Sequence, residues 1–232
     1  MKLADLAALN AEKAARRAAV LVTDTAAGET RLIRAAELAA APLTGSALGM
    51  AAAEAIRTGR SGMAEIDGRA LFLTAHVPPV RVVVTGAVHI SQALQPMARQ
   101  VGLDVTIIDP RTAFATPERF PGGTVLAEWP EAALPKVGLD VYTAFVALTH
   151  DPKIDDPGLI AALSARCFYI GALGSRKTHA ARVARLKDKG FSDEAIGAIH
   201  APVGIDIGAI SPAEIAVSIV AEIIAALRMR GA

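Results

Sequence analysis

The sequence contains a single cysteine, Cys167, among its 232 residues. One thiol excludes an internal disulfide bond and any zinc site built from cysteines. Cys167 precedes an apolar run, where a small core residue is expected and a nucleophile is not. The five histidines are scattered and form no H-x-x-x-H or H-E-x-x-H pair. The sequence therefore predicts no metal site.

An excess of charge of one sign is also lacking. The net charge is +1, which gives no electrostatic basis for binding nucleic acid. No uncharged apolar run approaches the ~20 residues that a membrane span requires. The first residues, 1–5, lack the charged-then-apolar layout of a secretory signal, so we expect a cytoplasmic protein. The G-x-S-x-G elbow of serine hydrolases is absent, and we predict no catalytic residue.

Hydrophobic residues make up 53% of the chain and charged residues 20%, which predicts an ordered core. Residues 1–79 read as a small α+β domain that ends in a proline-rich connector, 76–79. We expect helices over 1–18 and 46–57, strands over 20–23 and 31–33, and a hairpin of 63–66 and 70–73 around Asp67-Gly68.

From about residue 80 to 232, strands alternate with helices. We expect strands over 82–85, 105–108, 124–126, 141–148 and 168–170, and helices over 89–101, 156–165 and 211–227. A further helix follows the strand at 168–170 and carries Val183 and Leu186 on one face, and a short helix starts at 192–194. Continuous apolar strands in this alternation predict an α/β fold, a Rossmann-like doubly wound parallel sheet.

Two helix starts are marked by proline. Asp156-Pro157 reads as an N-cap and first helical position, and Ser211-Pro212-Ala213-Glu214 is a capping box. The last helix is apolar nearly all round. That pattern predicts burial on two sides, either within the sheet layers or across a dimer interface.

In such sheets the ligand binds beyond the carboxyl ends of the strands. Those ends place Gly86, Asp109, His150-Asp151 and Gly171 in chain order. Gly86 and Asp109 suggest a dinucleotide site, with Asp109 as the acid that holds a ribose. However, Val88 and Ser91 stand where the G-x-G-x-x-G pattern needs its later glycines, and a β-branched side chain opposes contact with a pyrophosphate. An NAD(P)-dependent oxidoreductase therefore remains an alternative.

The stretch 168–179, FYIGALGSRKTH, joins a strand to a basic helix. Gly171 and Gly174 allow a tight turn and close approach of a ligand, and Ser175 can cap the helix. The helix start and the Arg176 guanidinium suit an anion such as phosphate. The alternative is a connection whose residues are small for packing alone.

Three histidines and one acid complete the candidates. His150 could move a proton or hold a polar ligand, or it could only hydrogen-bond its loop. His89 and His179 begin helices, where the dipole favours neutral imidazole. Asp206 lies in a second glycine-rich loop, 200–208, which is either a site or a structural connection.

The chain resembles the xanthine dehydrogenase accessory factors of the XdhC/CoxI type over about residues 81–227. The resemblance rests on motifs in the family's order: Gly86-Ala87-Val88-His89, Ile108-Asp109-Pro110-Arg111, Phe114-Ala115-Thr116, Arg119-Phe120-Pro121, Trp129-Pro130, Leu148-Thr149-His150-Asp151-Pro152-Lys153, Tyr169 through His179, and Pro202-Val203-Gly204-Ile205-Asp206-Ile207-Gly208-Ala209.

The resemblance implies a molybdenum cofactor (molybdopterin) chaperone. Such proteins bind and protect the cofactor while a cysteine desulfurase supplies its sulfur ligand, and they help insert it into a xanthine dehydrogenase-like molybdenum hydroxylase. They are usually homodimers. The residues expected to bind the cofactor are Gly86, His89, Asp109, Arg111, His150, Asp151, Gly171, Gly174, Ser175, Arg176, Thr178, His179 and Asp206.

One departure concerns the N-terminal region. Family members often carry a glycine-rich segment with a cysteine where this chain has residues 45–51, and Ala51 stands at the cysteine position. Because alanine has no thiol, this position cannot ligate molybdenum or relay sulfur, and cofactor binding has to use other groups. A further alternative is a non-catalytic partner of the hydroxylase that senses a nucleotide or acts as a scaffold.

Overall fold

A computed structural model describes residues 2–229. The chain divides into two compact units, one up to Pro79 and one from Val80, and each is described by itself. Within the described residues, no helix is both long and apolar enough to cross a membrane.

The first unit is an antiparallel sheet with two helices. Its elements are α1 (Leu3–Ala14), β1 (Ala19–Asp24), β2 (Thr30–Arg34), a 3-10 turn (Ala35–Glu37), α2 (Ala47–Thr58), β3 (Gly62–Ile66) and β4 (Arg69–His76). The strand order is β2-β1-β4-β3. Asp67 and Gly68 both have positive φ, at 52° and 71°, as a two-residue hairpin turn requires. The expected hairpin is thus confirmed.

Alternation along β1 separates the two cores of this sheet. Val20 and Val22 pack in the cluster that includes α2, whereas Ala19 packs in the cluster that includes α1. Ser46 caps α2 by accepting a hydrogen bond from the Gly49 N–H at 3.0 Å. Ala51 is therefore part of a regular helix start, where its side chain is half-buried.

The second unit is a parallel sheet of six strands. Its elements are β5 (Arg81–Thr85), α3 (His89–Gln100), β6 (Asp104–Ile108), β7 (Thr124–Leu126), α4 (Pro130–Val137), β8 (Thr143–Ala147), α5 (Pro152–Ser164), β9 (Tyr169–Ala172), α6 (Arg176–Asp188), α7 (Asp193–Gly197), β10 (Ile199–His200) and α8 (Pro212–Arg228). The order β7-β6-β5-β8-β9-β10 is the 3-2-1-4-5-6 order of a Rossmann fold. The predicted fold class is confirmed.

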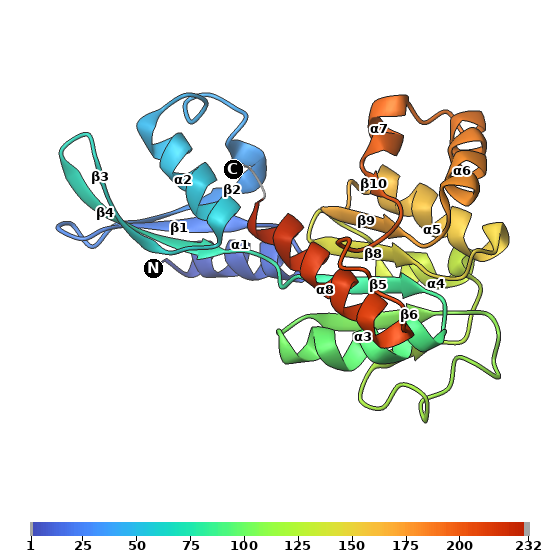
Figure 1. The fold of residues 1–232 in the computed structure, drawn as a ribbon. Helices are drawn as coiled ribbons and strands as arrows, with labels where there is room; N and C mark the ends of the chain where they lie inside the picture. The colour runs from blue at the N-terminus through green and yellow to red at the C-terminus, as the bar shows by residue number, and fades with distance from the viewer. Residues whose placement is uncertain (1, 230–232) are drawn as a thin grey trace. The chain divides into compact units, whose positions relative to one another are not determined.

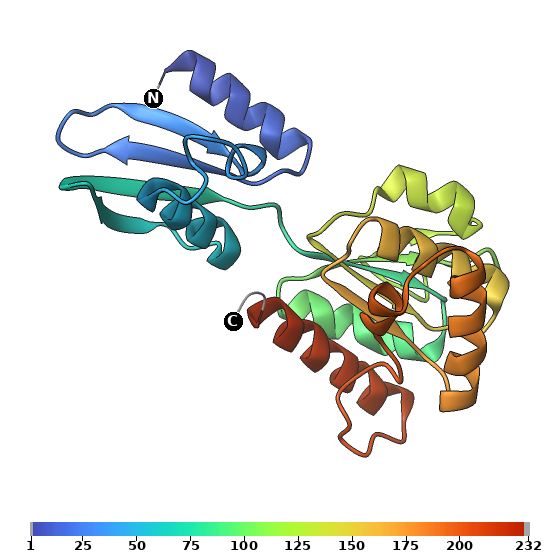
Figure 2. The ribbon, with the colours of Figure 1, turned by 90° about the horizontal axis from the view of Figure 1, so that it is seen from above.

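Helices cover both faces of this sheet (Figures 1 and 2). Val82 and Val84 point into the core with α3 and α8, and Val83 points into the core with α4, α5, α6 and α7. Because the strands are buried on both faces, they are continuously apolar. The apolar helix α8 packs beside α3 and on β9 within the same chain, which accounts for one of the two sides expected to be buried.

The structure corrects several predicted boundaries. The helix expected from Asp156-Pro157 begins at Pro152, because Asp151 is its N-cap and accepts a hydrogen bond from the Lys153 N–H at 2.9 Å. Asp151-Pro152 and Asp156-Pro157 both fit the N-cap and first position of a helix. Packing of α5 on the sheet selects the first pair. Gly171 lies inside β9, not in the turn after it. The sequence patterns missed α4 and the two-residue strand β10.

Candidate functional site

The strand order reverses between β5 and β8, so a ligand crevice is expected above their carboxyl ends. Gly86 follows β5 and Asp109 follows β6. His150 and Asp151 follow β8, and Gly174 follows β9. The topology therefore brings most of the predicted residues to one edge of the sheet.

The turn after β5 is closed by the chain's own side chains. The Ala87 N–H donates to the Asp109 carboxylate at 2.7 Å. The Val88 N–H donates to Ser91 Oγ at 2.9 Å, and the Ser91 hydroxyl donates back to the Gly86 carbonyl. These amides are the donors that would face a pyrophosphate in a dinucleotide site. Both are occupied, which weakens the dinucleotide interpretation.

Asp109 is fully buried, and its carboxylate is already paired. Arg111 donates to it through Nε at 2.9 Å, Nη2 at 2.6 Å and its backbone N–H at 2.9 Å. Burial opposes ionisation, but the Arg111 side chain and the Ala87 N–H outweigh it and lower the pKa of Asp109. The exposed Arg111 guanidinium also stacks over the Phe114 ring, 4.8 Å from its centroid. Asp109 therefore holds the first turn together and offers no oxygen to a ribose.

The loop after β8 is held by Asp155, a residue that the sequence patterns missed. Its carboxylate accepts hydrogen bonds from the Thr85 hydroxyl, from the Thr149 N–H and hydroxyl, and from the His150 N–H. Burial raises the pKa of Asp155, although these donors oppose the rise. His150 has a φ of +64°, which is uncommon for a residue other than glycine. Asp155 stabilises this conformation, and the His150 side chain is left exposed.

His150 lies against the turn that precedes α6. A Cβ added to Gly174, whose φ is +138°, would lie 3.6 Å from His150 Nδ1 and 3.1 Å from the Thr178 side chain. Ser175 caps α6 by accepting a hydrogen bond from the Thr178 N–H at 3.2 Å, as the sequence predicted. Arg176 and Lys177 are exposed, and their amides occupy helix positions that have no partner within a helix. Here the loops after β8 and β9 meet at donors suited to an anion.

The remaining predicted residues, Gly171, His89 and Asp206, make few contacts with the rest of the predicted site. Gly171 packs in the core, where a Cβ would lie 2.5 Å from Val203 and 2.7 Å from the Tyr169 hydroxyl. His89 is exposed at the start of α3, and Asp206 is exposed in its loop, where it accepts a hydrogen bond from the Gly208 N–H. Over residues 2–229, neither side chain hydrogen-bonds another predicted site residue.

A second polar cluster, also missed from the sequence, joins β9, β10 and α8. The Glu222 carboxylate accepts hydrogen bonds from the Tyr169 hydroxyl at 2.6 Å and the Gly204 N–H at 2.8 Å, and it contacts His200 Nδ1 at 2.9 Å. The Tyr169 and His200 rings lie 4.7 Å apart. Burial and the Glu222 carboxylate raise the pKa of Tyr169. This cluster fixes the start of the 201–211 loop.

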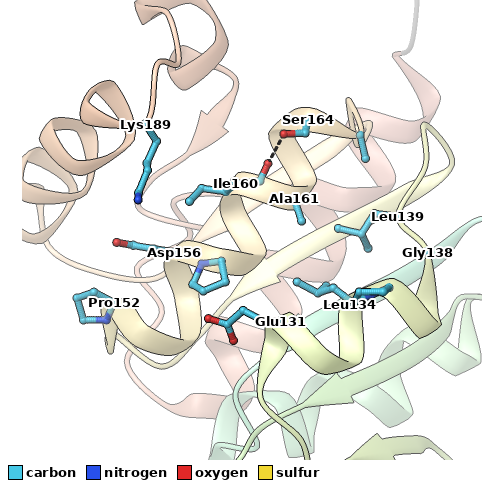
Figure 3. A pocket seen from close by; sticks show the side chains of 13 residues that line it. Glu131, Leu134, Gly138, Leu139, Pro152, Asp156, Ile160, Ala161, Ser164 and Lys189 are labelled. Carbon is cyan, nitrogen blue, oxygen red and sulfur yellow. Dashed lines mark hydrogen bonds between the residues drawn. The ribbon is translucent and has the colours of Figure 1, made fainter.

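A hollow of about 840 Å³ lies between α4 and α5 (Figure 3). Its lining is mainly apolar, with Leu134, Leu139 and Ile160, while Glu131 and Lys189 add charge. Its lining includes none of the predicted site residues, so the hollow is separate from the predicted site.

Metal and thiol ligands are scarce in this unit. Among residues 2–229, no group of three or more His, Cys, Asp or Glu side chains could hold a metal ion. Burial raises the pKa of Cys167 to about 12. The only thiol is therefore protonated near neutral pH and is a poor ligand or nucleophile.

Residues 82–223 match the family described as the XdhC Rossmann domain. The chain belongs to this family. The match includes every predicted site residue, from Gly86 to Asp206.

Three curated proteins are similar to the chain. The molybdenum cofactor insertion chaperone PaoD of Escherichia coli is 34% identical over 146 residues, which are 63% of this chain and 40% of PaoD. A probable xanthine dehydrogenase subunit of Bacillus subtilis is 33% identical over 155 residues, 66% of this chain and 45% of that protein. The uncharacterized protein YqeB of E. coli is 31% identical over 154 residues, 66% of this chain and 28% of YqeB. The chain thus matches less than half of each relative.

A solved structure shares the fold. The crystal structure of a xanthine dehydrogenase from Bacillus halodurans aligns with a TM-score of 0.64 at 22% identity. The alignment covers 97% of this chain and 64% of that chain. It therefore extends over both units.

Proposed function

We propose that this protein binds the molybdenum cofactor and helps to deliver it to a xanthine dehydrogenase-type molybdenum hydroxylase. The observation that carries the proposal is the 34% identity to the cofactor insertion chaperone PaoD. Membership of the XdhC family over residues 82–223 supports it.

The place where the loops after β8 and β9 meet suits one end of this cofactor. Molybdopterin carries a phosphate, and the start of α6 offers amide donors, the Ser175 cap and the exposed Arg176. Gly174 leaves room beside His150 that a Cβ would fill. These residues would hold the phosphate end. The bound cofactor supplies redox chemistry to the hydroxylase, while this chain supplies binding and shelter.

Sulfuration by a cysteine desulfurase would proceed without a thiol from this chain. Ala51 stands where family members often carry cysteine, and Cys167 is buried with a pKa of about 12. We therefore propose a protective role, in which the sulfur passes directly from the desulfurase to the cofactor. A homodimer and a cytoplasmic location are part of the same proposal.

The test is to purify the protein from cells that make the cofactor and to measure the fluorescent pterin released by oxidation. We expect pterin in the wild type and clearly less in Arg176→Ala, which removes a surface phosphate contact and should leave the fold intact. Lys187→Ala, at the other end of α6, is the charge-matched control. No pterin above background, together with unchanged hydroxylase activity in cells that lack the protein, would rule the proposal out.

The strand order also keeps an NAD(P) site as a second candidate. The occupied amides of the first turn argue against it. Titration with NAD⁺ and NADP⁺ separates the two, and we expect no binding at millimolar concentration. A protein that binds the hydroxylase but carries neither pterin nor dinucleotide would instead support a scaffold.

A further inference from the structure

Three buried side-chain nitrogen atoms lack a hydrogen-bond partner within residues 2–229, and all three lie on α6. They are His179 Nδ1 and the Nε and Nη1 atoms of Arg182. Buried polar groups in folded proteins nearly always have partners, and those without one call for an explanation such as a missing water or ion. Because the exceptions gather in one place, the explanation is local to this helix.

The Arg182 guanidinium reaches the turn before α6. Arg182 is 2% exposed, and its Nη2 donates to the Leu173 carbonyl at 2.9 Å. Leu173 leaves β9 and enters the turn that Ser175 closes as N-cap. Side chains on a helix point back towards its N-terminus, so His179 and Arg182 both extend from the body of α6 towards its start. The Arg182 guanidinium, with its unpartnered Nε and Nη1, therefore lies against the turn.

Among residues 2–229, no carboxylate hydrogen-bonds these nitrogen atoms. Burial lowers the pKa of Arg182, while the charges of Asp155 and Asp156 raise it. Asp155 accepts hydrogen bonds from the loop after β8, and Asp156 is paired with Arg185 at 2.5 Å. Arginine remains protonated even when buried, so a cation is left whose Nε and Nη1 have no hydrogen-bond partner. An anion with several acceptor oxygens matches that arrangement.

We propose that Arg182 and His179, together with the first amides of α6, form a phosphate-binding site beneath the turn of residues 173–175. The phosphate approaches from the exposed start of α6 and displaces this turn to reach the guanidinium. The proposal deepens the proposed function, on which it rests only for the identity of the ligand. The phosphate is that of the pterin itself or of a nucleotide attached to it.

The experiment uses inorganic pyrophosphate as the probe and the chain of residues 1–232, with calorimetry to measure affinity. We expect binding by the wild type, about tenfold weaker binding by Arg182→Met, and unchanged binding by the control Lys187→Gln, which removes the same charge at the other end of α6. Arg182→Lys should be intermediate, because a point charge replaces a planar fork. The Met variant keeps the volume of the side chain but loses the hydrogen bond to the Leu173 carbonyl, so we expect its melting temperature to fall by about 5 °C or less.

Several results would overturn the site. One is no pyrophosphate binding by the wild type at about 10 mM. Another is equal binding by the wild type and Arg182→Met. A third is a Met variant that folds but whose melting temperature falls by more than about 10 °C, which would show a structural role. If the Met variant does not fold, the NMR signal of the wild-type Arg182 Nε–H decides. A shift on adding pyrophosphate supports the site, and an unmoved signal overturns it.

The pterin assay separates this proposal from the proposed function. If pyrophosphate binding depends on Arg182 but the purified protein carries no pterin, the phosphate site is supported and the chaperone function is ruled out. Pterin that still co-purifies in full with Arg182→Met keeps the chaperone and removes the phosphate site.

Discussion

Asp109→Asn tests whether the acid after β6 serves the fold or a ligand. The wild-type carboxylate is fully buried and accepts four hydrogen bonds, one from the Ala87 N–H and three from Arg111. Asparagine keeps the size of the side chain and one acceptor oxygen, but it removes the charge and the second acceptor. We expect the variant to be less stable and its ligand affinity to change little.

The magnitude follows from the bonds that are lost. A hydrogen bond to a charged group contributes about 1.5–3 kcal/mol. The Arg111 side chain is 42% exposed, so water can replace part of its pairing with Asp109. The ion pair therefore contributes only a small part of the stability that is lost. The net loss is therefore about 2–4 kcal/mol, or a fall of about 5–15 °C in melting temperature.

The assay is guanidinium-induced unfolding of both proteins between pH 3 and 8. Asp109 has a lower pKa when folded, so its contribution is complete above its ordinary pKa of 3.8 and is lost as the pH falls through the folded value. The difference between the two proteins should be constant near neutral pH and shrink below about pH 4. The control is Asp206→Asn, an exposed aspartate at the same sheet edge, which should change stability by less than about 0.5 kcal/mol. An Asp109→Asn loss no larger than this control would refute the reasoning.

Four further experiments have defined outcomes. Gly86→Ala should cost about 2–3 kcal/mol in denaturant unfolding, because φ is +116° and its Cβ would lie 2.8 Å from a methyl group of the loop after β8. Gly102→Ala, with φ of +79° and open space around it, should cost only about 1 kcal/mol. Cys167 should react with a thiol reagent only on unfolding, since burial raises its pKa to about 12; rapid labelling of the native protein would contradict this. Tyr169→Phe should lose about 2 kcal/mol by the same unfolding assay, because it removes a buried donor to the Glu222 carboxylate at 2.6 Å.

Patterns that depend on neighbours in sequence predicted much of the fold. Asp67-Gly68 specifies a two-residue hairpin turn by itself, and the Ser211-Glu214 capping box specifies a helix start. Asp151-Pro152 and Asp156-Pro157 carry the same local signal, and the choice between them depends on packing against β8. A strand of two residues, such as β10, has too few positions to show any alternation.

The site was harder to predict because packing decides which side chains are buried in it. The Ser175 cap was visible, since its partner Thr178 is three residues away. Asp155 on α5 was missed although Thr149 and His150 are near in sequence, because its burial beside Thr85 of β5 depends on how the helix packs on the sheet. Arg182 is one of five cations on α6, and no pattern within the helix shows which of them is buried.

The hydrogen bonds within the first turn show that a domain can have the strand order of a dinucleotide-binding fold without free amides for a dinucleotide. This domain keeps the topology of a dinucleotide-binding fold, yet the amides that would receive a pyrophosphate are occupied by Asp109 and Ser91. The open helix start is two strands further along the sheet, a displacement of ~10 Å. A phosphate anchored there would lie on the other side of the point where the strand order reverses. Topology alone favours a dinucleotide at the first turn, whereas the unpartnered nitrogen atoms on α6 favour a ligand at the other helix.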